Sequence, residues 1–251
     1  MRKQGAIQAD ARFGQQQIVP IRPVDDAGQL KEDRAELIHF MCIMHALLLR
    51  IPAYNACMIH EKTILVIAGS VRPRRRCIAI SEWVAALGQP IVDAAVEVVD
   101  LKDWPLPMDA EPGVPAAGGY AYDNTRAWSE KIAAADAFVF VTPQYNWGYP
   151  ASLKNALDHL YREWAGKPAM IVTYGGHGGD KCARQLREVV TGLHMAPVAA
   201  MPGLTLPRGM IEADTPLDDA AALFDASADV VRQGWTELGQ AMTSRDAPRP
   251  I

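Results

Sequence analysis

Cysteine is scarce in this sequence, and its spacing fits neither a metal site nor a disulfide framework. The chain of 251 residues has four cysteines, Cys42, Cys57, Cys77 and Cys182, and no two of them form a C-x-x-C pair. Structural zinc sites and disulfide-rich domains depend on closely or regularly spaced cysteines. We therefore expect free thiols, a reducing compartment and no metal site.

A membrane-spanning run and a large excess of one charge are missing as well. The most apolar segment, residues 37–51, contains two histidines and an arginine, and it is too short to cross a bilayer. It also begins too far along the chain for a secretory signal peptide. The formal net charge of −4 gives no electrostatic basis for binding nucleic acid. These absences predict a cytoplasmic protein with no membrane and no nucleic-acid partner.

The composition leaves room for one large domain with an extension before it. Hydrophobic residues make up 49% and charged residues 22% of the chain, as in ordinary globular proteins. Residues 1–60 form the expected N-terminal extension, which is polar at first and then has one short helix at about 32–50. Residues 61–245 form the expected domain, and residues 246–251 a polar tail.

Three residues of that short helix suggest a metal site at first sight. His39, Cys42 and His45 lie three residues apart. On a helix such positions drift around the surface, and no fourth ligand is nearby. We interpret them as one face of a helix.

Buried strands alternate with helical segments from residue 64 onward. A continuous apolar run without polar alternation predicts a fully buried strand at 64–68. Another buried strand is predicted at 137–142, and further strands at 96–101, 167–174 and 197–201. Apolar residues at helical spacing predict helices at about 78–88, 124–135, 152–166, 181–193 and 217–242. This alternation is typical of a parallel, doubly wound α/β sheet.

The loop between the first strand and the first helix is rich in cations. It reads "GSVRPRRR", with Ser70, Arg72, Arg75 and Arg76 placed where free backbone N–H groups and the positive end of a helix dipole converge. Such a loop favours a phosphate group. The alternative is that the arginines only form a solvated surface run.

The usual nucleotide-binding motifs do not fit this loop. A P-loop needs Gly-Lys-Ser/Thr, and the segment contains no lysine. The dinucleotide fingerprint needs glycine at its first, third and sixth positions, which here hold Gly69, Val71 and Arg74. A monophosphate bound by serine and arginine in a doubly wound protein makes flavin mononucleotide (FMN) the leading candidate.

Three loops should meet at the carboxyl edge of the sheet, where ligands bind in this fold class. They are the cationic loop 69–77, the aromatic and amide-bearing loop 143–150, and the glycine-rich loop 175–179, "GGHGG". Their chemistry suits a ligand with a phosphate at one end and a flat ring at the other. "GGHGG" is alternatively a flexible turn with His177 in solvent, and Tyr145 and Trp147 are alternatively interface aromatics.

Together these motifs resemble the NADPH-dependent FMN reductase family of flavodoxin-like proteins, which also includes quinone and chromate reductases. The matching segments are "GSVRPRRR", "VDLKDWPLPMDAEP", "TPQYNWGYPASLKNALDHLYREWAGKPA" and "VTYGGHGG". The similarity runs from about residue 63 to about residue 197. Nothing in residues 1–60 resembles the family.

The resemblance implies a five-stranded flavodoxin-like sheet of order 2-1-3-4-5 and a set of cofactor contacts. Ser70, Arg72 and Arg76, with amides near Cys77 and Ile78, would hold the phosphate; residues 143–147 would border the ring, and residues 173–177 its far edge. The candidate cofactor-binding residues are Ser70, Arg72, Arg75, Arg76, Cys77, Ile78, Pro143, Gln144, Tyr145, Asn146, Trp147, Thr173, Tyr174, Gly175, Gly176 and His177.

This sequence departs from the family pattern at two places. Gln144 stands where the family usually has Glu, so the charge of that carboxylate is lost while hydrogen bonding is kept. Arg74 and Cys77 replace residues that are commonly small. Either could crowd the phosphate loop, and Cys77 could be a redox-sensitive neighbour of it.

The expected function is an FMN-dependent NAD(P)H oxidoreductase. NADPH or NADH would give hydride to the flavin, and a quinone, free flavin or similar small acceptor would then take the electrons. No side chain needs to act as acid or base, so no catalytic residue is predicted. One alternative is a flavodoxin-like electron carrier without direct NAD(P)H oxidation, and another is a binding protein that has lost the flavin. The resemblance also implies a homodimer or homotetramer.

Overall fold

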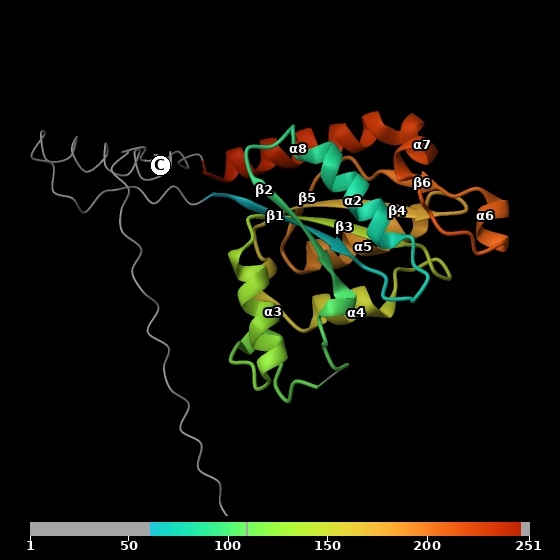
Figure 1. Cartoon of the computed structure of the whole chain (residues 1–251). Helices are drawn as coiled ribbons and strands as arrows, with labels where there is room; N and C mark the ends of the chain where they lie inside the picture. Colours follow the sequence, from blue (N-terminus) through green and yellow to red (C-terminus); the bar gives the residue numbers. More distant parts are fainter. Residues whose placement is uncertain (1–60, 109, 247–251) are drawn as a thin grey trace, which may run out of the picture. The chain divides into compact units, whose positions relative to one another are not determined.

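The computed structural model describes residues 61–108 and 110–246 (Figure 1). The expected helix at 32–50, the cluster of His39, Cys42 and His45, and the thiols of Cys42 and Cys57 lie outside the described residues. The division of the chain near residue 60 and the tail at 246–251 stay predictions. In the part described, no helix is long and apolar enough to cross a membrane.

A parallel sheet occupies the middle of the described domain. Its long strands are β1 (Thr63–Ala68), β2 (Ala95–Asp100), β3 (Ala137–Pro143) and β4 (Pro168–Gly175). They lie in the order β2-β1-β3-β4-β5, as predicted, and in register Ile64 stands opposite both Val96 and Ala137. Every residue of β3 is buried, which explains its continuous apolar sequence.

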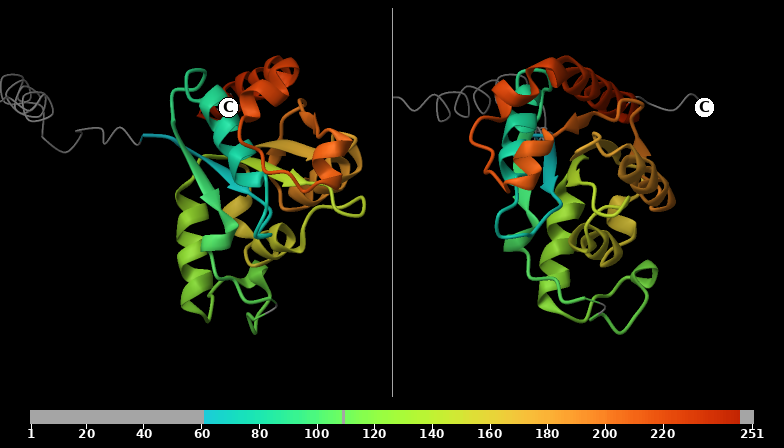
Figure 2. Two further views of the ribbon diagram at one scale, coloured as in Figure 1. Left: turned by 45° about the vertical axis from the view of Figure 1, so that its right-hand side comes forward. Right: turned by 90° about the vertical axis from the view of Figure 1, so that its right-hand side faces the viewer.

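Helices cover both faces of this sheet (Figures 1 and 2). One apolar cluster packs β1, β3 and β4 against α2 (Cys77–Gly88), α7 (Ala220–Phe224) and α8 (Ala228–Asp246). A second cluster packs the other face against α3 (Asp123–Ala134), α4 (Ala151–Asp158) and α5 (Asp180–Gly192). The arrangement is the flavodoxin-like α/β fold that the sequence predicted.

The fifth predicted strand is divided in two. β5 (Ala196–Pro197) pairs with the start of β4, and β6 (Gly203–Thr205) pairs with its end, so the sheet has six strands. Residues 198–202 lie between these two strands. Pro197 is the last residue of β5, and Pro202 directly precedes β6. Proline has no N–H for a ladder bond, and this accounts for the interruption.

Two predicted helices are shorter than expected. α4 ends at Asp158, and the region predicted as its second half contains a 3₁₀ turn, Arg162–Trp164. The buried indole of Trp164 donates a hydrogen bond to the Leu157 carbonyl at 3.2 Å, which satisfies one of the carbonyls freed at the helix end.

The predicted C-terminal helix is broken into α7, a 3₁₀ turn (Asp225–Ser227) and α8. It begins at residue 220 because the Asp219 carboxylate accepts a bond from the Ala222 amide at 2.9 Å and so caps the helix. A further short helix, α6 (Arg208–Glu212), lies between the predicted strand 197–201 and the predicted helix 217–242.

Close packing between α2 and α8 generates a test of the fold. A Cβ atom added to Gly88 would lie 2.0 Å from the ring of Trp235, which is fully buried. We expect Gly88→Ala to lower the free energy of unfolding by about 1–3 kcal/mol, through overpacking. Chemical denaturation followed by circular dichroism measures the change.

Gly192 provides the matched control, because it also ends a helix and a Cβ added to it would meet nothing within 4 Å. We expect Gly192→Ala to change the unfolding free energy by less than about 1 kcal/mol. Equal destabilisation of the two variants would contradict the packing of Gly88 against Trp235.

Candidate cofactor site

A cavity of about 560 Å³ lies at the carboxyl edge of the sheet. Its size is within the usual range for small-molecule sites. It brings together the loop after β1, the loop after β3, the end of β4 and the segment that contains α6. The lining residues are Arg72, Pro73, Arg74, Arg75, Arg76, Pro143, Gln144, Tyr145, Tyr174, Gly175, Gly176, Leu206, Ile211 and Asp214.

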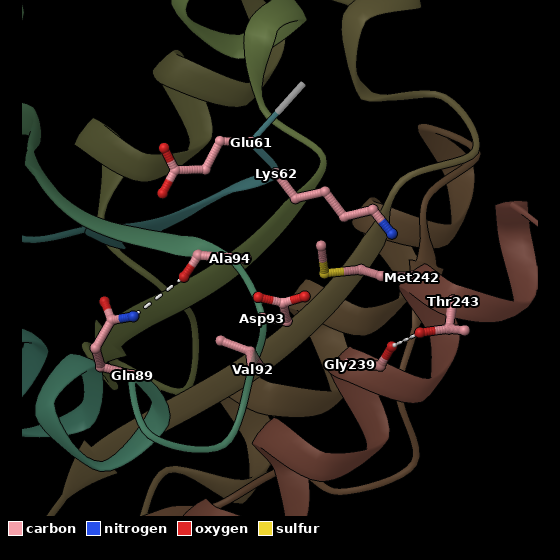
Figure 3. A pocket seen from close by; sticks show the side chains of 9 residues that line it. All are labelled: Glu61, Lys62, Gln89, Val92, Asp93, Ala94, Gly239, Met242 and Thr243. Atoms are coloured by element: carbon pink, nitrogen blue, oxygen red, sulfur yellow. Dashed lines mark hydrogen bonds between the residues drawn. The ribbon is translucent and has the colours of Figure 1, made fainter. Parts of the chain in front are cut away.

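A larger cavity, of about 670 Å³, lies at the opposite edge of the sheet (Figure 3). Residues that precede β1 and β2, such as Lys62 and Ala94, line it together with Met242 and Thr243 of α8. None of the candidate cofactor residues lines this cavity. Because ligands of doubly wound proteins bind at the carboxyl ends of the strands, the smaller cavity is the candidate site.

The loop between β1 and α2 is held firmly at its first residue. The Gly69 amide donates to the Val141 carbonyl at 2.9 Å, and the Ser152 hydroxyl donates to the Gly69 carbonyl at 2.6 Å. A Cβ atom at Gly69 would lie 3.2 Å from both Leu153 and Thr142. The loop therefore starts where only glycine fits without displacing its neighbours.

The N-terminus of α2 has no side-chain cap. Its first backbone N–H groups, including those of Cys77 and Ile78, are therefore left for another acceptor. Ser70, in the loop that leads to α2, is fully buried, and its hydroxyl lies 3.0 Å from the hydroxyl of Tyr145. The donors are of the kind that binds phosphate at a helix N-terminus.

All four arginines of the loop line the cavity, and Arg72 and Arg75 have partners near the sheet. The guanidinium of Arg72 lies 3.8 Å from the centre of the Tyr145 ring, in a cation–π contact. Arg75 forms an ion pair with Asp100 at the end of β2. The Arg75 Nε atom is buried without a hydrogen-bond partner among the described residues. A buried unpaired donor of this kind fits a site made for an anion.

The other two arginines of the loop contact the α6 segment. Arg76 Nε donates to the Thr215 carbonyl at 2.9 Å, and its Nη2 donates to the carbonyls of Thr215 and Met210. Arg74 pairs with Asp214 at 3.1 Å and its side chain is 80% exposed. These arginines therefore join the start of α2 to a segment far along the chain.

The loop after β3 is a tight hairpin. Tyr145 and Gly148 exchange backbone hydrogen bonds of 2.8 and 2.9 Å, and Asn146 and Trp147 between them have φ angles of 47° and 73°. Positive φ at both central positions defines the type I′ turn that joins antiparallel segments. A tryptophan in this conformation is unusual, and such strain is often found near functional sites.

The candidate residues that do not line the cavity are Ser70, Cys77, Ile78, Asn146, Trp147, Thr173 and His177. Asn146 and Trp147 lie at the hairpin tip, where Trp147 is 64% exposed and its ring contacts the Lys181 ammonium. His177 is exposed on the following loop, and Ile78 is half-buried in α2. Thr173 is buried, and its hydroxyl donates to the Gly178 carbonyl at 2.8 Å. These side chains lie in or beside the loops around the cavity.

Cys77 and Cys182 are both free, as the sequence predicted for them. Burial raises the pKa of the Cys77 thiol, and its Sγ donates to the Val141 carbonyl at 3.2 Å. Burial also raises the pKa of Cys182, to about 12. Both groups therefore stay protonated, which disfavours the reactivity that an exposed thiolate would have.

The third side of the cavity carries no signal in the sequence. Leu206, Ile211 and Asp214 line it, although no motif or period in residues 206–215 marked them. The proline-rich segment after β2 does not line this cavity. Residues of that loop, including Trp104 and Leu106, instead line a separate cavity of about 420 Å³ with Val71 and Ser152.

The fold and cavity together define a flavodoxin-like protein with an arginine-rich loop at the carboxyl edge of its sheet. The model of the NADPH-dependent FMN reductase family matches residues 63–203. This chain belongs to that family. It is therefore an oxidoreductase enzyme that uses FMN and NAD(P)H.

Similarities to individual proteins support the assignment of the chain to this family. The chain is 50% identical over 189 residues to an NAD(P)H-dependent FMN reductase of Schizosaccharomyces pombe, covering 74% of this chain and 94% of that one. It is 36% identical over 108 residues to a quinone reductase of Escherichia coli, covering 41% and 54%. The structure of the flavoenzyme FerB from Paracoccus denitrificans shares the fold, with a TM-score of 0.55, 20% identity and coverage of 73% and 98%.

The side chain of Gln144 connects the hairpin to α5. The side-chain Oε1 atom of Gln144 accepts a hydrogen bond from the backbone N–H of Cys182 at 3.1 Å. The backbone N–H of Gln144 donates to the Tyr174 carbonyl at 2.9 Å. Cys182 lies three residues after Gly179, the N-cap residue of α5, which has no side chain to cap the helix. Gln144 therefore takes the part of a capping residue from another element.

We expect Gln144→Ala to lower the free energy of unfolding by about 0.5–2 kcal/mol, because the amide of Cys182 loses its acceptor. Gln144→Glu should retain the capping oxygen and leave stability within about 1 kcal/mol of the original at pH 7. Thermal melts of the three proteins measure this. Equal stability of Gln144→Ala and the original protein would contradict the capping role.

Proposed function

We propose that this enzyme passes electrons from NAD(P)H to a small acceptor such as a quinone or free flavin, with FMN held in the cavity at the carboxyl edge of the sheet. One observation carries the proposal: cationic donors and a glycine- and tyrosine-lined surface converge on the same cavity of about 560 Å³. FMN needs both, because it has a phosphate at one end and a flat ring at the other.

The donors around residues 69–78 fit the phosphate of FMN. We assign it to the guanidinium of Arg72, which lines the cavity, and to the buried hydroxyl of Ser70 and the uncapped amides of Cys77 and Ile78 in the same loop and helix start. The unpaired Nε of Arg75 supports an anion at the same place. Charge-assisted bonds from guanidinium groups are stronger than neutral ones.

The opposite end of the cavity fits an isoalloxazine ring. Gly175 and Gly176 have no side chains, so their backbone can lie close to a ring edge. Tyr145 and Pro143 supply apolar surface. Burial raises the pKa of the Tyr174 phenol, which keeps this wall uncharged. When bound, FMN supplies the chemistry of accepting hydride and releasing electrons, while these residues orient it and exclude water.

Arg72→Ala tests the phosphate assignment. Loss of one charge-assisted bond, about 1.5–3 kcal/mol, should weaken FMN binding about ten- to a hundredfold. Arg232→Ala is the control, because Arg232 lies on α8, is 49% exposed and pairs only with Asp229 among the partners found in the described residues. Fluorescence titration with FMN measures both dissociation constants. An unchanged constant for Arg72→Ala would contradict the assignment.

An absorbance spectrum of the purified protein with FMN, before and after anaerobic addition of NADPH, tests the proposed function. We expect the bands of bound flavin to bleach with NADPH and to return when 1,4-benzoquinone is added. Bound flavin that no nicotinamide bleaches would favour an electron carrier. Failure to bind flavin would overturn the proposed site.

A further inference from the structure

The wall of the cavity formed by residues 206–215 lies beyond the part of the chain that the family model matches, residues 63–203. The Leu206 amide donates to the Gly175 carbonyl at 2.9 Å, which fixes the start of this wall at the end of β4. α6 follows at Arg208–Glu212 and brings Ile211 to the cavity. The family model therefore does not describe this wall, and its contacts must be taken from the structure of this chain.

Ile211 is unusual among the cavity residues because it is large, apolar and 42% exposed. Its side chain lies close to the backbone of Gly176, since a Cβ atom added to Gly176 would be 3.4 Å from Ile211 Cδ1. Leu206 is buried beside it on the same wall. An apolar group half in solvent at the rim of a cavity can be covered by a ligand that enters and leaves.

Arg76 fixes the backbone on both sides of Ile211. Its guanidinium donates to the carbonyl of Met210 at 2.9 Å and to the carbonyl of Thr215 at 2.6 Å. The Arg76 side chain is only 12% exposed, so these charge-assisted bonds are partly shielded from water. The planar guanidinium can reach both carbonyls at once, whereas the single ammonium of a lysine has no such fork.

We propose that Ile211 is a specificity-determining residue that contacts the ring of the electron acceptor, and that Arg76 is the positioning residue that holds it there. The inference rests on the proposed function, with FMN against Gly175 and Gly176. The acceptor class is an uncharged, flat ring such as a quinone, because Ile211 and Leu206 offer apolar surface. Ile211 would limit the size of the ring that fits.

Ile211→Ala and Ile211→Trp test this with two quinones of different size, at saturating NADPH and FMN. We expect Ile211→Ala to raise the ratio of kcat/KM for 1,4-naphthoquinone to kcat/KM for 1,4-benzoquinone about tenfold, and Ile211→Trp to lower it by a similar factor. Ile91→Ala is the matched control, because Ile91 is 37% exposed but lies outside the cavity. Its ratio should not change.

The outcomes separate this inference from the proposed function. If the original protein reduces both quinones and the ratio is the same in all variants, Ile211 does not select the acceptor and the inference is wrong. If the Ile211 variants change the dissociation constant of FMN and leave the ratio unchanged, Ile211 contacts the cofactor instead. If the original protein binds no FMN, the proposed function and this inference fail together.

Arg76→Lys tests the positioning role. We expect Arg76→Lys to lower the KM for 1,4-naphthoquinone several-fold, which raises the ratio of kcat/KM values as Ile211→Ala does. The kcat and the dissociation constant of FMN should change less than threefold. A loss of FMN affinity like that of Arg72→Ala, with an unchanged quinone ratio, would show that Arg76 binds phosphate and does not position Ile211. Thermal melts of the variants check that the fold is kept.

Discussion

Parallel pairing of β1 with both β2 and β3 is the constraint on which the site depends. Because these strands and β4 run the same way, the loops that follow β1, β3 and β4 must all lie at one edge of the sheet. The loops bring cations, an aromatic hairpin and bare glycine backbone to a single cavity. Burial of the sheet on both faces makes that edge rigid enough to orient a ligand.

Four arginines lie within the five residues 72–76, and their positive charges have partners elsewhere in the chain. Arg75 is paired with Asp100, Arg74 with Asp214, and Arg76 with two backbone carbonyls, so three of the charges are already partly compensated. Arg72 instead lies against the face of Tyr145. Three of the arginines thus contact other parts of the chain, and Arg72 contacts an aromatic ring of the cavity, a division that composition alone does not reveal.

Local sequence determined much of the fold, because a buried parallel strand has a continuous apolar run, as at 64–68 and 137–142. It predicted a parallel sheet with three loops at its carboxyl edge, and the resemblance to the family supplied the strand order. It did not predict the divided fifth strand or the wall at 206–215, where α6 has five residues and no measurable period. The contact of Arg76 with Met210 spans 134 residues, and only folding brings such groups together.

A crystal structure of the full chain with bound FMN would show which cavity holds the flavin. We expect the flavin at the carboxyl edge of the sheet, with its phosphate within hydrogen-bond distance of Arg72 and the first amides of α2, and its ring beside Tyr145 and Gly176. Flavin bound in the cavity at the opposite edge, or a phosphate turned away from α2 toward solvent, would contradict this expectation.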